Sequence, residues 1–222
     1  RYEEDFALAQ SLGHTAHRFS LEWARIEPEE GKFNAEAIEH YRQVIRSCRA
    51  HGMEPIVTLW HFTLPQWFAD RGGFENRAAP EIFARYARYV AEQLTDELGR
   101  VTTMNEPIVF AGLGWLKGNW PPFKKFSLSD AFTMTDSGDD ARARARSSIW
   151  APLVYARVVD NLVAAHRQAY PAIKAVAPHT QVSLVKHVVA FDANWNPSQQ
   201  ARGLSQGPVP QPLLSPAGAR AL

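Results

Sequence analysis

The sequence predicts an α/β fold built around a parallel sheet, and three observations lead to that prediction. A helical stretch, a glycine and a short strand follow one another three times, with the glycines at positions 13, 52 and 99. Residues 55–59 (PIVTL) are almost entirely apolar, which is typical of a strand covered on both faces. Polar residues gather where the strands end. We therefore interpret the repeat as successive right-handed units of strand and helix.

The first unit is predicted to be a helix over residues 2–12 and a strand over residues 14–21. Gly13 stands where a left-handed residue commonly ends a helix. The strand includes Arg18 among apolar neighbours. The apolar positions that recur at helical spacing in this unit are Tyr2, Phe6, Ala9 and Leu12.

The second and third units repeat this order. A helix with an apolar stripe over residues 38–48 precedes the strand at 55–59, and His61 follows that strand closely. Pro80 suits the first turn of the third helix, which leads into a short strand ending at Glu106. Polar residues therefore follow each of these strands.

The fourth unit is built differently, because residues 107–147 show no clear periodicity and predict a long loop. A further strand is expected at 182–185. From residue 197 the chain is rich in Pro, Gln, Gly and Ser, which predicts a partial domain over 1–196 and a tail over 197–222 that is linker-like or foreign to the domain. The helix between the loop and the strand is expected to bury Trp150, Val154, Val158, Leu162 and Ala165.

Composition narrows the function. The chain is 45% hydrophobic and its formal net charge is +1, which predicts a globular protein without the field that recruits nucleic acid or an anionic membrane. This charge balance fits small neutral ligands better than nucleic acid or a membrane. Cys48 is the only cysteine, so an internal disulfide and a Cys-rich metal site are excluded, and we expect a reducing, cytoplasmic location with no metal or cofactor. The chain opens with Arg1, so we expect the native N-terminus to be missing.

Two architectures remain for these units, part of a barrel or an open doubly wound sheet. The open sheet predicts a glycine-rich phosphate loop after a strand, and neither G-x-G-x-x-G nor G-x-x-x-x-G-K-[ST] occurs. The uniform units and their polar strand ends favour part of a barrel. Glu106 then becomes a candidate acid or base, since barrels place their chemistry at the carboxyl ends of strands. The alternative is that Asn-Glu-Pro simply forms a polar turn.

Five motifs occur in order between residues 1 and 196. They are RFSLEWARI at 18–26, GKFN at 31–34, TLWHFTLPQW at 58–67, GGF at 72–74 and TMNEP at 103–107. Together they resemble glycoside hydrolase family 1, the retaining β-glycosidases that include β-glucosidases.

The resemblance implies a partial (β/α)8 TIM barrel, roughly strands two to five with their helices. It implies that Glu106 is the general acid/base and that Asn105 and His61 bind hydroxyl groups of the glycone. It implies that Arg18 orients the nucleophilic carboxylate and that Trp120 faces the leaving-group side. Amide and imidazole groups suit hydroxyls, and a guanidinium suits a carboxylate. The expected partner is a β-glycoside or oligosaccharide substrate.

Simpler structural roles remain open for several of these residues. His61 could be an ordinary core histidine, and Arg18 could form a structural ion pair with Glu22. Trp23 and Trp67 are more simply packing residues. Glu22 has no assigned role.

The sequence also departs from the family. Retaining hydrolysis needs a second carboxylate about 5–5.5 Å from the acid. The family carries this nucleophile on strand seven in a Thr-Glu-Asn-Gly motif, which is absent here. We therefore expect the chain alone to be inactive. The leading hypothesis is a piece of a β-glycosidase whose intact form hydrolyses β-glucosides or related β-glycosides by a retaining double-displacement mechanism. The alternatives are a degenerate, non-catalytic fragment, a sugar-binding remnant, or another retaining barrel glycosidase.

Overall fold

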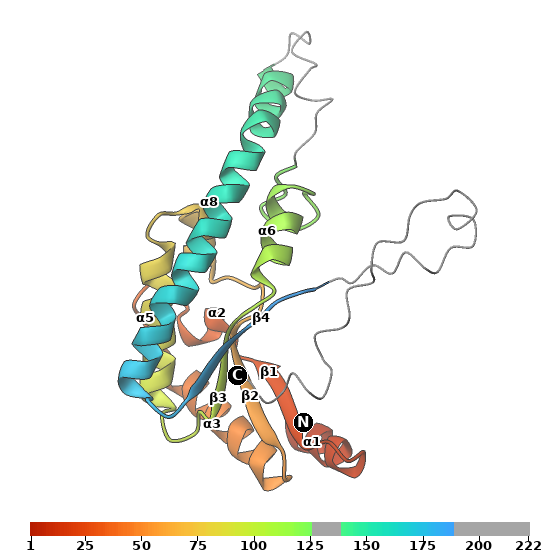
Figure 1. Ribbon diagram of the computed structural model, residues 1–222, viewed down its shortest axis with the longest axis vertical. Helices are drawn as coiled ribbons and strands as arrows, with labels where there is room; N and C mark the ends of the chain where they lie inside the picture. Colours follow the sequence, from red (N-terminus) through yellow and green to blue (C-terminus); the bar gives the residue numbers. More distant parts are fainter. Residues whose placement is uncertain (126–138, 189–222) are drawn as a thin grey trace, which may run out of the picture. The chain divides into compact units, whose positions relative to one another are not determined.

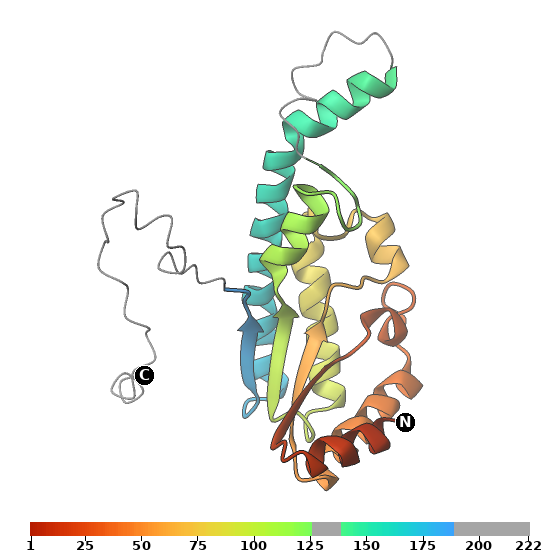
Figure 2. The same ribbon diagram turned by 90° about the vertical axis from the view of Figure 1, so that its right-hand side faces the viewer.

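The computed structural model describes residues 1–125 and 139–188, with only the backbone given for residues 139–149. The predicted tail at 197–222 lies outside the described residues. The described chain forms a parallel sheet with the strand order β1-β2-β3-β4 (Figures 1 and 2). Its strands are β1 (Ala16–Ser20), β2 (Glu54–Trp60), β3 (Arg100–Asn105) and β4 (Gln181–Val185).

The register brings the carboxyl ends of the strands to the same edge of the sheet. Ser20 pairs with Thr58, Thr58 with Thr102, and Thr102 with Ser183. This order and direction confirm the parallel α/β fold, and the strand ends lie together as expected for an arc of a barrel.

Long helices cover one face of this sheet, and short helices lie in the connections after the strands. The side chain of Asn34 caps the start of one long helix by accepting hydrogen bonds from the backbone N–H groups of Glu36 and Ala37. The helices are α1 (Tyr2–Ser11), α2 (Trp23–Ile26), α3 (Ala35–Ala50), α4 (Gln66–Asp70), the 3-10 helix η1 (Gly73–Glu75), α5 (Ala79–Gln93), α6 (Pro107–Trp115) and α8 (Asp139–Val176).

Two expectations about the fourth unit are wrong. The predicted loop at 107–147 contains all of α6 and the start of α8. Helix α6 forms directly after β3 because Pro107 stands in its first turn, where the missing N–H of proline has no cost. The predicted buried stripe also fails at one end. Trp150 is 58% exposed, and Ala151 is buried in its place. In the first unit, α1 ends at Ser11. Leu12, the last apolar position of the predicted helix, therefore lies just beyond it and is 69% exposed.

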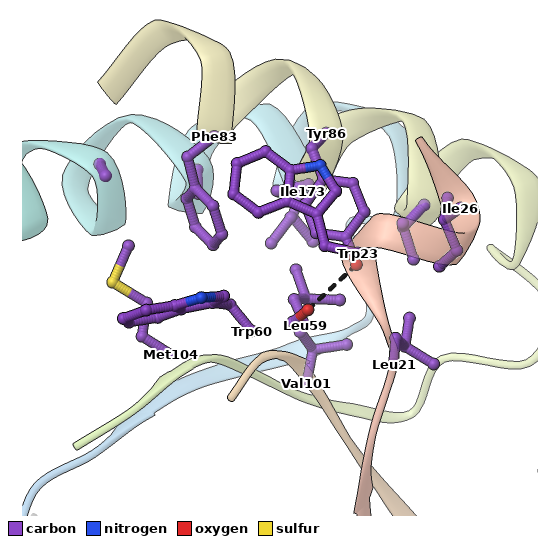
Figure 3. Close-up of a cluster of buried hydrophobic side chains, with 14 of the residues drawn as sticks. Leu21, Trp23, Ile26, Leu59, Trp60, Phe83, Tyr86, Val101, Met104 and Ile173 are labelled. Atoms are coloured by element: carbon purple, nitrogen blue, oxygen red, sulfur yellow. Dashed lines mark hydrogen bonds between the residues drawn. The ribbon is translucent and has the colours of Figure 1, made fainter. Parts of the chain in front are cut away.

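Aromatic residues fill the core between the sheet and the helices (Figure 3). Trp23 stacks on Tyr86 with ring centroids 4.8 Å apart, and the Tyr86 hydroxyl donates to the Leu59 carbonyl at 3.0 Å. Helix α5 is thus tied directly to strand β2. The prediction that Trp23 and Trp67 are packing residues is confirmed. Trp23 is 1% exposed, and the two indole rings pack edge to face.

A buried carboxylate fixes the connection that follows α2. Glu27 is fully buried and accepts hydrogen bonds from the Trp23 indole and the Gly31 backbone N–H, each at 2.8 Å. Arg85 of α5 forms an ion pair with the same carboxylate. Because the charge is both paired and hydrogen-bonded, its burial is tolerated.

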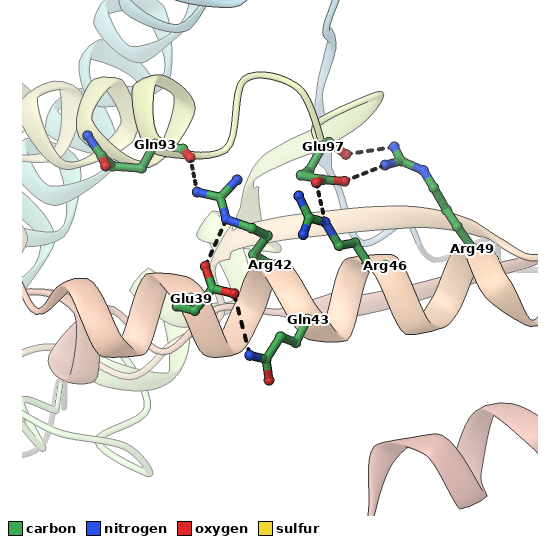
Figure 4. Close-up of polar contacts among 7 residues, drawn as sticks. All are labelled: Glu39, Arg42, Gln43, Arg46, Arg49, Gln93 and Glu97. Atoms are coloured by element: carbon green, nitrogen blue, oxygen red, sulfur yellow. Dashed lines mark hydrogen bonds and ion pairs between the residues drawn. The ribbon is translucent and has the colours of Figure 1, made fainter.

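The amino end of the sheet is held by a second cluster of charges (Figure 4). Glu97 precedes β3, and its carboxylate accepts from Arg46 at 2.6 Å and from Arg49 at 3.0 Å. Arg49 also donates to the Glu97 carbonyl, and Arg42 donates to the Gln93 carbonyl. These contacts join α3 to the end of α5 and the start of β3.

Within the part of the chain that the structure describes, no helix combines the length and the apolar character needed to cross a bilayer.

Candidate active site

Glu106 lies at the carboxyl end of β3, where it begins α6. Its backbone is in the left-handed region, with φ +43° and ψ +55°. Its backbone N–H donates to the carbonyl of Val185, the last residue of β4, at 2.9 Å. A left-handed conformation is uncommon for a residue with a side chain, and such residues concentrate at functional sites. The neighbouring strand therefore holds a strained residue in place.

Asn105 and Arg18 meet beside Glu106. The Arg18 guanidinium donates to Asn105 Oδ1 at 2.9 Å and to Thr58 Oγ1 at 3.3 Å, while Asn105 is 3% exposed. Because the amide oxygen accepts from a cation, the amide Nδ2 hydrogens remain as donors for another group. Glu22, which we considered as an alternative partner of Arg18, instead accepts from the Thr63 hydroxyl.

His61 follows the end of β2 and is half-buried. Burial lowers the pKa of its imidazole, and the nearby Arg18 charge lowers it further, while Glu106 acts in the opposite direction. The ring is thus neutral near pH 7, with one nitrogen able to donate and the other able to accept. His61 follows β2, the strand that lies between β1, which carries Arg18, and β3, which ends beside Glu106.

His187 was not singled out from the sequence. It lies just beyond β4, and its Nδ1 is 3.6 Å from Glu106 Oε1. The side chains of His187 and Glu106 are 51% and 29% exposed. The signal that could have found it is the one that found His61, a polar residue directly after a parallel strand.

Trp120 lies beside this cluster, at a distinct apolar cavity. Its ring packs on Phe62 with centroids 4.7 Å apart. Both line a cavity of about 680 Å³, whose lining combines aromatic, proline and small residues with an ion pair between Glu75 and Lys124. The strand-end residues Arg18, His61, Asn105 and Glu106 are not in the lining of this cavity. The ring of Phe62 also packs on His61, with centroids 4.8 Å apart, so it contacts both His61 and Trp120.

The arrangement offers a carboxyl group for proton transfer beside uncharged groups that can bind hydroxyls. The model of the family "Glycosyl hydrolase family 1" matches residues 1–204. The chain belongs to glycosyl hydrolase family 1.

Relatives in this family are named for several activities. The chain is 30% identical over 193 residues to the chloroplastic galactolipid galactosyltransferase SFR2 of Arabidopsis thaliana, covering 84% of the chain and 28% of that protein. It is 39% identical over 132 residues to 6-phospho-beta-galactosidase 1 of Streptococcus pneumoniae, covering 59% of the chain and 28% of that protein. It is 37% identical over 123 residues to the human cytosolic beta-glucosidase, covering 54% of the chain and 26% of that protein.

Solved structures of the family match the fold. The family 1 β-glucosidase from Thermotoga maritima matches 86% of the chain with a TM-score of 0.72 and 28% identity, over 38% of its own length. The beta-glycosidase from Pyrococcus horikoshii matches 83% of the chain with a TM-score of 0.66 and 36% identity, over 37% of its own length. This chain therefore spans less than a third of the curated relatives and less than two fifths of these structures. Its sheet and helices form part of a (β/α)8 barrel.

Proposed function

We propose that this chain supplies the acid/base side of a retaining β-glycosidase that acts on β-glucosides or related β-glycosides. Glu106 is the general acid/base, which protonates the glycosidic oxygen and then deprotonates the attacking water. The observation that carries the proposal is the joining of Arg18 to Asn105 directly beside Glu106, at the carboxyl end of a parallel sheet. Membership of a glycosyl hydrolase family supports it.

Asn105 and His61 hold hydroxyl groups of the sugar. The amide of Asn105 presents its Nδ2 hydrogens because its oxygen accepts from Arg18, and such a donor can bind a sugar 2-hydroxyl. A contact of that kind strengthens in an oxocarbenium-like transition state. The neutral ring of His61 can donate to one hydroxyl oxygen or accept from another hydroxyl, which suits a glycone.

Arg18 and Trp120 contact other parts of the reacting system, the nucleophile and the leaving group. Arg18 uses one nitrogen, Nη1, for Asn105 and Thr58, so the rest of its fork can orient a nucleophilic carboxylate. Trp120 lies behind Phe62 at the apolar cavity, which supports a place on the leaving-group side. A solved relative in complex with glucoimidazole and another with salicin support a sugar-derived ligand for this class of site.

The 222-residue chain on its own is expected not to turn over a glycoside, since the Thr-Glu-Asn-Gly motif of the nucleophile is absent from its sequence. The test compares the purified chain with a longer chain that is continued through the eighth strand with the matching segment of a family relative. The substrate is an activated aryl β-glucoside, whose leaving group needs little protonation. We expect turnover in the longer chain and none in the 222-residue chain.

Glu106→Gln in the 222-residue chain controls for contaminating activity. Turnover by the 222-residue chain that disappears in Glu106→Gln would show that another residue supplies the second carboxylate. Inactivity of both lengths would favour the second candidate, a degenerate or sugar-binding remnant without turnover, for which the missing nucleophile motif is the favouring observation. A cytoplasmic location remains part of the proposal, because one relative is named a cytosolic beta-glucosidase.

A further inference from the structure

The turn after β2 is held in a conformation that its residues do not favour. The backbone N–H of Thr63 donates to the His61 carbonyl at 3.0 Å, which closes a tight turn around Phe62. Phe62 has a φ of +74°, in the region that a bulky residue rarely adopts. Contacts from outside the turn must therefore stabilise it.

Two such contacts meet at Thr63. Its carbonyl accepts from the indole N–H of the buried Trp60 at 2.9 Å. Its hydroxyl lies 3.1 and 3.0 Å from the two carboxylate oxygens of Glu22 and donates to that group. The first contact is local, whereas the second comes from the connection after β1, 41 residues earlier in the chain.

Glu22 is itself firmly held. Its carboxylate accepts from the backbone N–H of Ala24 at 3.3 Å and so caps α2. Its own backbone N–H donates to the Tyr41 hydroxyl at 2.8 Å. The next residue, Trp23, is packed in the core against Tyr86. The core therefore fixes the carboxylate that faces Thr63.

We propose that Glu22 is a positioning residue, whose carboxylate holds Thr63 and thereby fixes the turn that presents His61 to the sugar. The same turn sets Phe62 against Trp120, with ring centroids 4.7 Å apart. The proposal rests on the proposed function for the contact between His61 and the sugar. If Glu22 served only to cap α2, removing the Thr63 hydroxyl would have no effect on the turn.

The test follows the Trp60 indole proton, which reports directly on the Thr63 carbonyl. Hydrogen exchange of this proton is measured by NMR in the 222-residue chain, together with the urea midpoint of unfolding. Thr63→Val removes the hydroxyl and keeps the shape of the side chain. Because a hydrogen bond to a charged acceptor is lost, we expect exchange to become about fivefold faster. The free energy of unfolding should fall by no more than the roughly 1 kcal/mol to which this fivefold change corresponds, so the urea midpoint shifts only slightly.

Two further variants and an internal control sharpen the result. Glu22→Gln keeps an acceptor oxygen for Thr63 and for the α2 cap, so exchange should rise less than in Thr63→Val. Glu22→Thr combined with Thr63→Glu exchanges hydroxyl and carboxylate across the same gap, and we expect it to restore slow exchange. The indole proton of Trp23, which is bonded to Glu27, should keep its rate in every variant.

Unchanged exchange at Trp60 in Thr63→Val would overturn the proposal. So would equal acceleration at Trp60 and Trp23 with a lower urea midpoint, because that pattern means general destabilisation. In the longer, hydrolytic chain, Thr63→Val should raise KM for the aryl β-glucoside about fivefold, and the double exchange should restore it. If the longer chain shows no turnover, the proposed function fails, while the exchange rates in the 222-residue chain still decide whether Glu22 positions the turn.

Discussion

The two ends of the sheet are built on opposite principles. At the carboxyl end, Glu106 and Phe62 both have positive φ values, +43° and +74°. At the amino end, Glu97 has a side chain only 9% exposed, and its carboxylate receives donors from Arg46 and Arg49. One end holds residues in unfavourable conformations, whereas the other end satisfies a nearly buried charge.

This difference suggests that the amino end stabilises the fold and lets the carboxyl end keep its strain. Barrels separate the two tasks in this way, with stability at one face and chemistry at the other. Strain at a functional site persists only where the surrounding structure enforces it. Substitutions at either end of the sheet test this difference between the two ends.

The largest effect on stability is expected from Glu97→Ala at the amino end. The change leaves Arg46 and Arg49 without their shared carboxylate, so the free energy of unfolding should fall by about 2–3 kcal/mol, less than for a fully buried pair because both arginines are partly exposed. Urea unfolding measures the loss. Glu92→Ala is the matched control, since its pair with Arg88 is exposed and should change stability by less than about 0.5 kcal/mol. Equal losses in the two variants would contradict this role for the cluster.

A smaller effect is expected at Glu106, where glycine should stabilise the fold relative to alanine. Glycine adopts positive φ without strain and alanine does not, so Glu106→Gly should be more stable than Glu106→Ala by about 1 kcal/mol. At an ordinary helical position alanine is the more stable of the two, and Gln43 on α3 serves as that control. The midpoints of thermal unfolding of the four variants give the comparison. Alanine being favoured at both sites would show that residue 106 is not strained.

The smallest effect concerns pH. Burial lowers the pKa of His166, a residue of α8 whose Nδ1 lies 2.8 Å from the Thr103 hydroxyl. The unfolded chain therefore binds the proton more readily, and stability should be greatest above pH 6.5 and fall as the pH drops below it. His166→Gln removes the titrating group, so stability measured at several pH values should fall less steeply. An identical slope in both proteins would rule out this contribution.

Much of the fold was predictable because its signals are local. Gly13 and Gly52 have the positive φ values expected at the ends of helices. The convergence of Arg18, His61, Asn105 and Glu106 followed from the single assumption of parallel strands. The start of α6 was missed because residues 107–147 show no clear periodicity, although a proline directly after a strand suits a first helical turn.

Contacts between distant residues could not be predicted. Nothing in the sequence distinguishes the buried Glu27 from the exposed Glu29 and Glu30, since its burial depends on Arg85, which is 58 residues away. Likewise, parallel strands predict that Arg18 and Asn105 lie at the same edge of the sheet, but not that these residues, 87 positions apart, are hydrogen-bonded to each other. Such pairs become visible only when the helices and strands are placed in space.

The most direct test of the account is the dependence of Glu106→Gln on the leaving group, measured in the longer, hydrolytic chain. We expect cleavage of an alkyl β-glucoside, whose leaving group needs protonation, to fall by about 10²- to 10⁴-fold. The first step with an activated aryl β-glucoside should change far less, and added azide should speed the second step because it needs no general base. Equal losses for both substrates without rescue by azide, or no loss for either, would contradict the assignment of Glu106 as the acid/base.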